Sequence, residues 1–244
     1  MLDDKITILI PTSPIKSHPD TRIISFVVDS CRFHFPTAQI LIMVDGLRRE
    51  QEEYRERYDE YKNHLSSKCT AEWRNVYALR FGEHMHQVGM TREALRVLVN
   101  TPLILFVEHD TPIVTDEPIE WEPIMNTCLD GTANMVRLLH EAQILKAHSH
   151  LTLDTITHNG IRLTKTLQWS QRPHVARTDF YKKMLEENFS ENANSMIEDR
   201  MHGACQDQEW SYSKMMIYNP NDTNIKRSYH TDGREGDEKF DMKF

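Results

Sequence analysis

Two acidic side chains follow directly after the most strand-like segment of the chain. Residues 103–107 read Leu-Ile-Leu-Phe-Val, and Glu108, His109 and Asp110 come next. Ligands of open α/β sheets bind beyond the carboxyl ends of strands, and alternation along an extended segment would point Glu108 and Asp110 the same way. Hard carboxylate oxygens suit Mg2+ or Mn2+, which bridge phosphate oxygens. The motif predicts such a metal site; the alternative is that both acids only solvate a strand end.

Glycine-based phosphate loops and several familiar catalytic motifs are absent from the sequence. It contains no Walker A loop, no GxGxxG after the first strand, no HExxH and no GxSxG. Only eight glycines occur, which disfavours a dinucleotide site built on a glycine-rich turn. A metal ion is therefore the expected means of holding phosphate groups.

A second segment carries groups that suit sugar recognition. Trp169, Gln171 and Arg172 lie within Trp-Ser-Gln-Arg-Pro-His at 169–174. An aromatic face packs against the apolar face of a sugar, while amide and guanidinium groups bond to hydroxyls. The segment is either part of an acceptor site or a structural turn before the helix expected at 179–188.

The hydrophobic pattern predicts alternating strands and helices. A β-branched run at 6–10 is closed by Pro11 and Thr12, and a second run at 39–44 is stopped by Asp45, which is typical of buried parallel strands. This order predicts a single α/β domain with a mixed, mostly parallel sheet flanked by helices. Further strands are expected at 76–81, 103–107, 135–139, 161–169 and 215–218, and helices at 23–31, 47–67, 91–99, 124–129, 179–188 and 195–206.

Length and charge narrow the class of protein. A chain of 244 residues is long enough for one sizeable α/β domain. Its formal net charge of −8 lacks the basic footprint of proteins that grip a nucleic-acid backbone. Nucleic acid is therefore disfavoured as the main partner, although it is kept as an alternative.

Cysteine spacing and the N-terminus indicate the cellular compartment. Four widely spaced cysteines form no CxxC pair, so we expect free thiols in a reducing environment. Acidic residues precede the first short apolar run, unlike a signal peptide, and no apolar run approaches the ~18 residues of a membrane span. A cytoplasmic protein without a membrane span is predicted, in the host cytoplasm if the chain is viral.

The order of these segments resembles the GT-A glycosyltransferases, particularly the large inverting family related to cellulose and chitin synthases. The resemblance covers roughly residues 5 to 205 and implies the GT-A (Rossmann-like) fold. The matching segments are the first strand with its Pro-Thr loop at 6–13, the second strand with its terminal Asp at 40–46, the glycine-led helix at 89–94, the strand with the Asp-x-Asp motif at 103–110 and the later Glu-Asp motif at 197–199.

This resemblance implies donor-binding roles for residues in the first half of the chain. Pro11, Thr12 and Asp45 would lie near the nucleoside, with Asp45 contacting the base or the ribose. Arg92 would approach the donor diphosphate or ribose. Glu108 would be a second metal ligand or a ribose contact.

The resemblance also implies the metal ligand and the general base. Asp110 would bind the metal directly, and Asp199 would take the proton of the acceptor hydroxyl, with Glu198 as its neighbour. The alternative for Glu198 and Asp199 is an exposed pair on a helix. Two departures stand out, because Glu108 replaces the first Asp of the metal motif and no QxxRW element is present.

A polar tail at 219–244 follows the last expected strand. Some GT-A enzymes recruit a late histidine to the metal and a nearby basic residue to the diphosphate. By resemblance, His230 and Arg234 would take these roles as the tail closes over the donor. The alternative is a solvated tail.

Together these features predict an inverting glycosyltransferase that moves a hexosyl or pentosyl group from a UDP-, GDP- or TDP-sugar to an acceptor hydroxyl. Residues 1–218 would form the catalytic domain, with a nucleotide-sugar half at about 1–115 and an acceptor half at about 116–218. The alternatives are a non-catalytic sugar- or nucleotide-binding domain, a metal-dependent hydrolase and a nucleotidyltransferase. Nucleotidyltransferases usually carry a glycine-rich loop with Arg and Lys after the first strand, which 11–16 lacks.

Overall fold

Four parallel strands form the first half of the sheet, as the apolar runs predict. The computed structural model describes residues 2–220 and 225–231. The four strands lie in the order β3-β2-β1-β4, with bounds β1 (Ile6–Thr12), β2 (Gln39–Val44), β3 (Val76–Arg80) and β4 (Leu103–Phe106). Every residue of β1 and β4 is buried, because helices cover both faces of the sheet. Strands buried on both faces read as near-continuous apolar runs, which is why they were predictable.

The second half of the sheet is mixed. It continues as β4-β8-β5-β9-β7-β6, with bounds β5 (Met135–Arg137), β6 (Thr152–His158), β7 (Ile161–Thr166), β8 (His174–Arg177) and β9 (Met215–Tyr218). Because β8 is antiparallel to both β4 and β5, Phe106, His174 and Arg137 lie in one row across three strands. Strands β6 and β8 are additional to the expected ones. β6 is largely exposed and β8 has only four residues, so neither leaves a long apolar run in the sequence.

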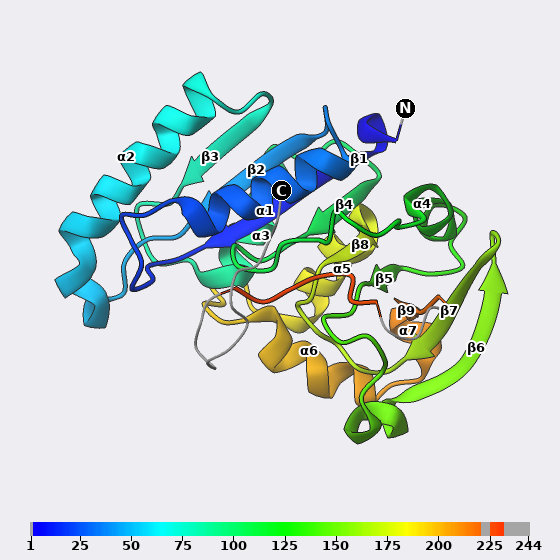
Figure 1. The fold of residues 1–244 in the computed structure, drawn as a ribbon. Coiled ribbons are helices and arrows are strands. Elements are labelled where there is room, and N and C mark those ends of the chain that lie inside the picture. The colour runs from blue at the N-terminus through cyan, green and yellow to red at the C-terminus, as the bar shows by residue number, and fades with distance from the viewer. Residues whose placement is uncertain (1, 221–224, 232–244) are drawn as a thin grey trace.

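Helices cover both faces of the sheet (Figure 1). One face packs against α1 (Arg22–His34), α2 (Arg55–Ala71) and α4 (Trp121–Leu129), and the other against α3 (His86–Val97), α5 (Thr178–Asn188) and α6 (Ile197–Gln206). The expected tyrosine stripe at 47–67 is partly confirmed, since Tyr58 and Tyr61 are buried residues of α2. The remaining short helices are η1 (Asp3–Lys5), η2 (Arg49–Tyr54), η3 (Lys146–Leu151) and α7 (Trp210–Ser213).

These layers confirm the predicted α/β fold class with a mixed sheet flanked by helices. All four cysteines are free thiols, as expected. Within 2–220 and 225–231, no helix combines the length and the apolar character that crossing a bilayer requires.

Candidate active site

The strand directions bring most of the candidate residues to one edge of the sheet. β1, β2 and β4 are parallel, and β5 points the same way because β8 is antiparallel to both β4 and β5. We call the edge formed by their last residues the carboxyl edge. Thr12 and Arg137 end strands there, Asp45 follows β2, and Glu108 and Asp110 follow β4. In open α/β sheets, this edge is where ligands bind.

Glu108 and Asp110 lie in a turn at this edge. The backbone N–H and the Oγ1 hydroxyl of Thr111 both donate to the carbonyl of Glu108, at 3.1 and 3.2 Å. The extended backbone assumed for the motif is therefore wrong, and alternation does not orient the two carboxylates. Instead, Glu108 Oε1 accepts a hydrogen bond of 2.8 Å from Gln87 Nε2 on α3. Asp110 is buried, with 4% of its surface exposed, and it approaches His230.

The separation of Asp110 and His230 falls between the values for adjacent and for opposite ligands of one cation. Oδ2 of Asp110 is 3.7 Å from Nε2 of His230. Two ligands at ~2.1 Å from a metal are ~3 Å apart when adjacent and ~4 Å apart when opposite. No three His, Cys, Asp or Glu side chains converge within the described residues. Mg2+ is usually held by one or two protein carboxylates together with water and substrate phosphates.

Backbone hydrogen bonds hold the segment 225–231 against the acidic turn. Ser228 forms an antiparallel bridge with Ile113, and the carbonyl of Asp110 accepts from the N–H and the Oγ1 of Thr231, at 2.8 and 2.9 Å. In Figure 1 this orange-to-red stretch crosses the middle of the view. The structure thus places His230 of the predicted tail at the acidic motif. Arg234 lies outside the described residues.

A buried arginine at the carboxyl edge was missed by the sequence reasoning. Arg137 is 2% exposed, and its Nη2 donates to Gln168 Oε1 at 2.8 Å. Its Nε and Nη1 are buried and have no hydrogen-bond partner in the described part of the chain. Burial, reinforced by the nearby Arg172, lowers the pKa of Arg137 to about 9, while Glu141 and Glu198 oppose that shift. A charged residue inside an apolar strand run, Met-Val-Arg, was the signal that could have found it.

Glu198 and Asp199 occupy the first turn of α6 and face different ways. Glu198 is half-buried, accepts a hydrogen bond of 3.4 Å from the backbone N–H of Gln171 and acts electrostatically on Arg137. Asp199 is exposed, and its negative charge favours the protonated form of His86. Burial lowers the pKa of His86, helped by Arg48 and opposed by Asp199. The pair therefore lies at the carboxyl edge, with one carboxylate directed inward and the other open to solvent.

Trp169 and Gln171 belong to the interior, which corrects their predicted acceptor-binding role. Trp169 has no exposed surface, so its ring cannot stack on a sugar, and its Nε1 donates to Gln171 Oε1 at 3.3 Å. Gln171 is 2% exposed, and its Nε2 donates to Gln87 Oε1 at 2.7 Å. Arg172 is half-buried and forms a two-pronged ion pair with Glu141. Of the three predicted acceptor residues, only Arg172 keeps a partly accessible side chain.

Asp45 organises a loop, which corrects its predicted contact with the base or ribose. Its carboxylate accepts hydrogen bonds from the backbone N–H groups of Gly46, Met85 and His86, at 2.9, 2.7 and 3.1 Å, and lies 2.7 Å from His84 Nδ1. An ionised carboxylate offers about four lone-pair sites. Three backbone N–H groups therefore use most of this acceptor capacity, and the carboxylate is buried, with 2% exposed.

Arg92 also serves the fold, which corrects its predicted contact with the diphosphate. Its guanidinium joins α3 to the C-terminal end of α5 by donating to four backbone carbonyls, those of Leu185, Phe189, Ser190 and Glu191. Free carbonyls at a helix end attract a cation. This arginine therefore satisfies the end of α5.

The end of β1 is covered in this structure. Pro11 and Thr12 are both buried, and Thr12 Oγ1 lies 3.3 Å from the hydroxyl of Tyr61. The ring of His18 stacks on Tyr61 with centroids 3.7 Å apart, and burial lowers the pKa of His18 to about 3. A neutral imidazole therefore closes this part of the edge.

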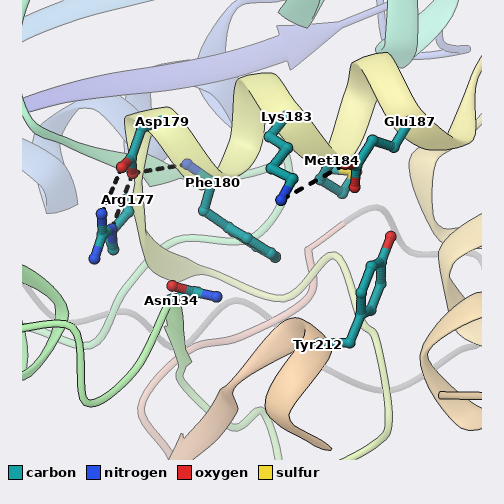
Figure 2. A pocket seen from close by; sticks show the side chains of 8 residues that line it. All are labelled: Asn134, Arg177, Asp179, Phe180, Lys183, Met184, Glu187 and Tyr212. Atoms are coloured by element: carbon teal, nitrogen blue, oxygen red, sulfur yellow. Dashed lines mark hydrogen bonds and ion pairs between the residues drawn. The ribbon is translucent and has the colours of Figure 1, made fainter. Parts of the chain in front are cut away.

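A cavity lies at the opposite edge of the sheet, where β8 ends and β5 begins (Figure 2). It has a volume of about 310 Å³, and none of its lining residues was a candidate. Its charges are paired locally, since Arg177 Nε is 2.9 Å from Asp179 Oδ1 and Lys183 Nζ is 3.6 Å from Glu187 Oε1. Figure 2 shows Phe180 and Tyr212 on two sides of this hollow.

Comparisons with known proteins give relatives in structure but none in sequence. No protein-family model matches the chain, and no curated protein does. S. aureus TarS 1–349 in complex with UDP-GlcNAc matches with a TM-score of 0.53 at 13% identity, over 96% of this chain and 60% of that one. GalNAc-T7 with UDP, GalNAc and Mn2+ matches with a TM-score of 0.52 at 8% identity, over 93% of this chain and 43% of that one.

A third solved structure matches over nearly its whole length. UDP-glucose pyrophosphorylase complexed with UDP-glucose has a TM-score of 0.51 at 11% identity, over 91% of this chain and 92% of that one. By contrast, this chain spans about 60% of the TarS 1–349 chain. At such identities the likeness establishes the fold alone. The chain has the Rossmann-like α/β fold that these GT-A glycosyltransferases share with a nucleotidyltransferase.

Proposed function

We propose that this protein is a metal-dependent glycosyltransferase that transfers a sugar from a nucleoside-diphosphate donor to an acceptor hydroxyl. The observation that carries the proposal is the meeting of Asp110 and His230, 3.7 Å apart, at the carboxyl edge of a GT-A-like sheet. The solved structures with this fold hold UDP-GlcNAc in one case and UDP, GalNAc and Mn2+ in another. Both the site and the fold therefore favour a nucleotide-sugar donor.

Asp110 and His230 would hold Mn2+ or Mg2+ in this account. The metal, when bound, neutralises charge on the departing nucleoside diphosphate. Glu108 supports the same turn through its hydrogen bond with Gln87. Arg137 adds a buried positive charge beneath the edge. Arg234, outside the described residues, remains a predicted diphosphate contact.

Asp199 is the proposed general base. It is the exposed member of the Glu198-Asp199 pair, so an acceptor hydroxyl can reach it, and a carboxylate accepts that proton as the hydroxyl oxygen attacks the anomeric carbon. Attack opposite the leaving diphosphate gives inversion. Glu198 faces inward and anchors the first turn of α6 through the N–H of Gln171. Arg172, paired with Glu141, is proposed to contact the acceptor.

The order of the matching segments extends the proposal to the inverting family related to cellulose and chitin synthases. The donor half would occupy about 1–115 and the acceptor half about 116–218. The nucleoside would enter at the ends of β1 and β2, which requires His18 to leave its stack on Tyr61. Thr12 would then become accessible.

A screen of thermal stability tests the proposed function. Purified protein is melted with UDP, GDP or TDP, each with and without Mn2+. A ligand that binds only the folded state raises Tm, and 100-fold excess over Kd adds about 2.7 kcal/mol. We expect one nucleotide to raise Tm only when Mn2+ is present. The proposal fails if no nucleoside diphosphate raises Tm in Mn2+.

A nucleotidyltransferase is the second candidate, because the chain covers 92% of the UDP-glucose pyrophosphorylase structure. Its reaction would join a sugar phosphate to a nucleoside triphosphate and release pyrophosphate. The loop after β1 lacks the expected glycine-rich sequence, which disfavours this candidate. Pyrophosphate release from UTP, GTP or TTP with sugar 1-phosphates would favour it over the transferase.

A further inference from the structure

We propose that Gln87 and Gln171 are positioning residues whose paired side-chain amides couple the acidic turn to the start of α6. This inference rests on the proposed function and deepens it, because the acidic turn carries the proposed metal ligand and α6 carries the proposed base. The two amides and their hydrogen bonds are hereafter the amide relay. Neither glutamine is placed in contact with the metal or the donor.

The first half of the relay is Gln87, in the first turn of α3. Its side chain is 6% exposed and uses both ends of the amide. Nε2 donates to Glu108 Oε1 at 2.8 Å, while Oε1 accepts from Gln171 Nε2 at 2.7 Å and from the backbone N–H of Ile197 at 3.3 Å. An ionised carboxylate only accepts and a backbone N–H only donates. The orientation of this amide is therefore fixed by its partners, and a flipped amide would lose these bonds.

The second half of the relay is Gln171, in the loop before β8. Its Oε1 accepts from the indole N–H of Trp169 at 3.3 Å, which fixes the orientation of this amide as well. Its backbone N–H donates to Glu198 Oε2 at 3.4 Å. The relay thus begins at the carboxylate of Glu108 and ends at the indole of Trp169, and the backbone of the same Gln171 contacts Glu198.

The relay joins four segments that are far apart in the sequence. Gln87 and Gln171 are separated by 84 positions, and Gln87 and Ile197 by 110. Their bonds are buried, where an unmade hydrogen bond is most costly. A movement of the acidic turn is therefore transmitted through Gln87 to Ile197, the first residue of α6. Since a displacement of ~1 Å at a reacting group costs about 100-fold in rate, such coupling matters for the reaction.

Methionine substitutions remove the relay while keeping most of the side-chain volume. Gln87→Met deletes the bonds to Glu108, Gln171 and Ile197, and Gln171→Met deletes only the side-chain bonds to Gln87 and Trp169. Gln206→Met is the matched control, because Gln206 is half-buried near the end of α6 and donates only to the carbonyl of His202, at 3.1 Å. Should either methionine variant fail to fold, Gln87→Asn and Gln171→Asn break the same bonds by shortening the reach.

The test combines Mn2+ titration, followed by electron paramagnetic resonance, with hydrogen exchange at the Ile197 amide. In the wild type, Mn2+ should bind and slow this exchange, since Ile197 N–H is part of the relay. Gln87→Met should bind Mn2+ about 10-fold more weakly, as for other partners that support a metal ligand. Gln171→Met should keep its Mn2+ affinity within about 3-fold but lose the effect of Mn2+ on exchange. Gln206→Met should behave as the wild type.

The kinetics of sugar transfer distinguish a positioning role from a purely structural one, because only a positioning role predicts a change in kcat without a change in KM. With the donor found by the thermal screen, Gln171→Met should lower kcat about 10-fold and leave the donor KM within about 3-fold. Wild-type affinity and exchange in both relay variants would overturn the relay alone. A wild type that binds no Mn2+ would overturn the proposed function, and the relay with it.

Discussion

The two edges of the sheet differ in how their polar side chains are connected. At the carboxyl edge, buried polar groups bond across the fold, as Gln87 does with Glu108 and Gln171. At the opposite edge, around the cavity of Figure 2, the charges pair with near neighbours in sequence, as in Arg177 with Asp179. Exposed local pairs contribute little to stability and need no particular fold. Buried hydrogen bonds between residues far apart in the sequence form only when the whole fold brings the partners together. Functional sites often contain such contacts.

The cavity of Figure 2 and the proposed metal site lie at opposite edges of the sheet. The cavity of about 310 Å³ has balanced charges and partly exposed walls. The carboxyl edge is partly covered, with His18 over the end of β1 and segment 225–231 over the acidic turn. The proposed nucleoside site at that edge therefore requires His18 to leave the end of β1.

Matched carboxylate substitutions at the two edges should differ most. Asp110→Asn removes the proposed metal ligand, so we expect it to abolish the Mn2+-dependent rise in Tm and to lower transfer by about 1000-fold or more. Asp179→Asn, at the cavity, should leave both within about 2-fold because the Asp179 carboxylate is largely exposed beside Arg177. Thermal melts and initial rates measure both. Equal effects of the two substitutions would remove the distinction between the edges.

The two carboxylates of α6 should separate binding from chemistry. Asp199→Asn removes the proposed base and should lower kcat by about 100-fold while nucleotide binding in Mn2+ stays unchanged. Glu198→Gln keeps the shape of a side chain that accepts from Gln171 N–H, so its effect on kcat should be smaller, about 10-fold. Steady-state kinetics with nucleotide titration distinguish them. A larger loss in Glu198→Gln than in Asp199→Asn would make Glu198 the base.

Arginine substitutions compare a fully buried cation, Arg137, with a half-buried one, Arg177. Arg137→Met should lower transfer by about 10-fold, because it removes positive charge beneath the edge. The free energy of unfolding should change by less than about 1 kcal/mol. The substitution removes the hydrogen bond to Gln168, which destabilises the fold, but it also removes a buried and incompletely hydrogen-bonded charge, which stabilises it. Arg177→Met, whose native side chain is 32% exposed, is the control and should keep transfer within about 2-fold. Full activity in Arg137→Met would exclude Arg137 from the site.

The last comparison concerns acid stability and not transfer. His174 is fully buried between Arg172 and Tyr181, and burial lowers its pKa to about 4. The unfolded chain binds the proton at its ordinary pKa of 6.5, so stability is complete above that pH and falls as the pH drops toward about 4. The loss for this group is at most about 3 kcal/mol. His174→Phe should flatten the dependence of Tm on pH in this range, and an unchanged pH dependence would contradict this role of His174.

The fold was more predictable than the site because apolar patterns report burial directly. The strand at 39–44 and the acidic motif after β4 follow from residue type and order. β8 could not be predicted, since its burial comes from insertion between β4 and β5 and not from its own four residues. Tertiary pairing decided that element.

The roles of individual site residues could not be predicted, because they depend on hydrogen-bond partners that are distant in the sequence. Asp45 and Arg92 match donor-binding positions in type and place, yet backbone groups occupy their polar atoms. Trp169 is an aromatic residue beside polar ones, and it proved to be core. Arg137 was hidden inside a strand pattern, although it is buried and its pKa is lowered.

A crystal grown with Mn2+ and the stabilising nucleoside diphosphate tests the central claim most directly, because Mn2+ is located by its anomalous scattering. The account predicts one strong peak within about 2.3 Å of Asp110 Oδ2 and His230 Nε2, with diphosphate oxygens completing its shell. A peak elsewhere, for example among Asp179 and Glu187 at the cavity, with Asp110 and His230 unengaged, would contradict it.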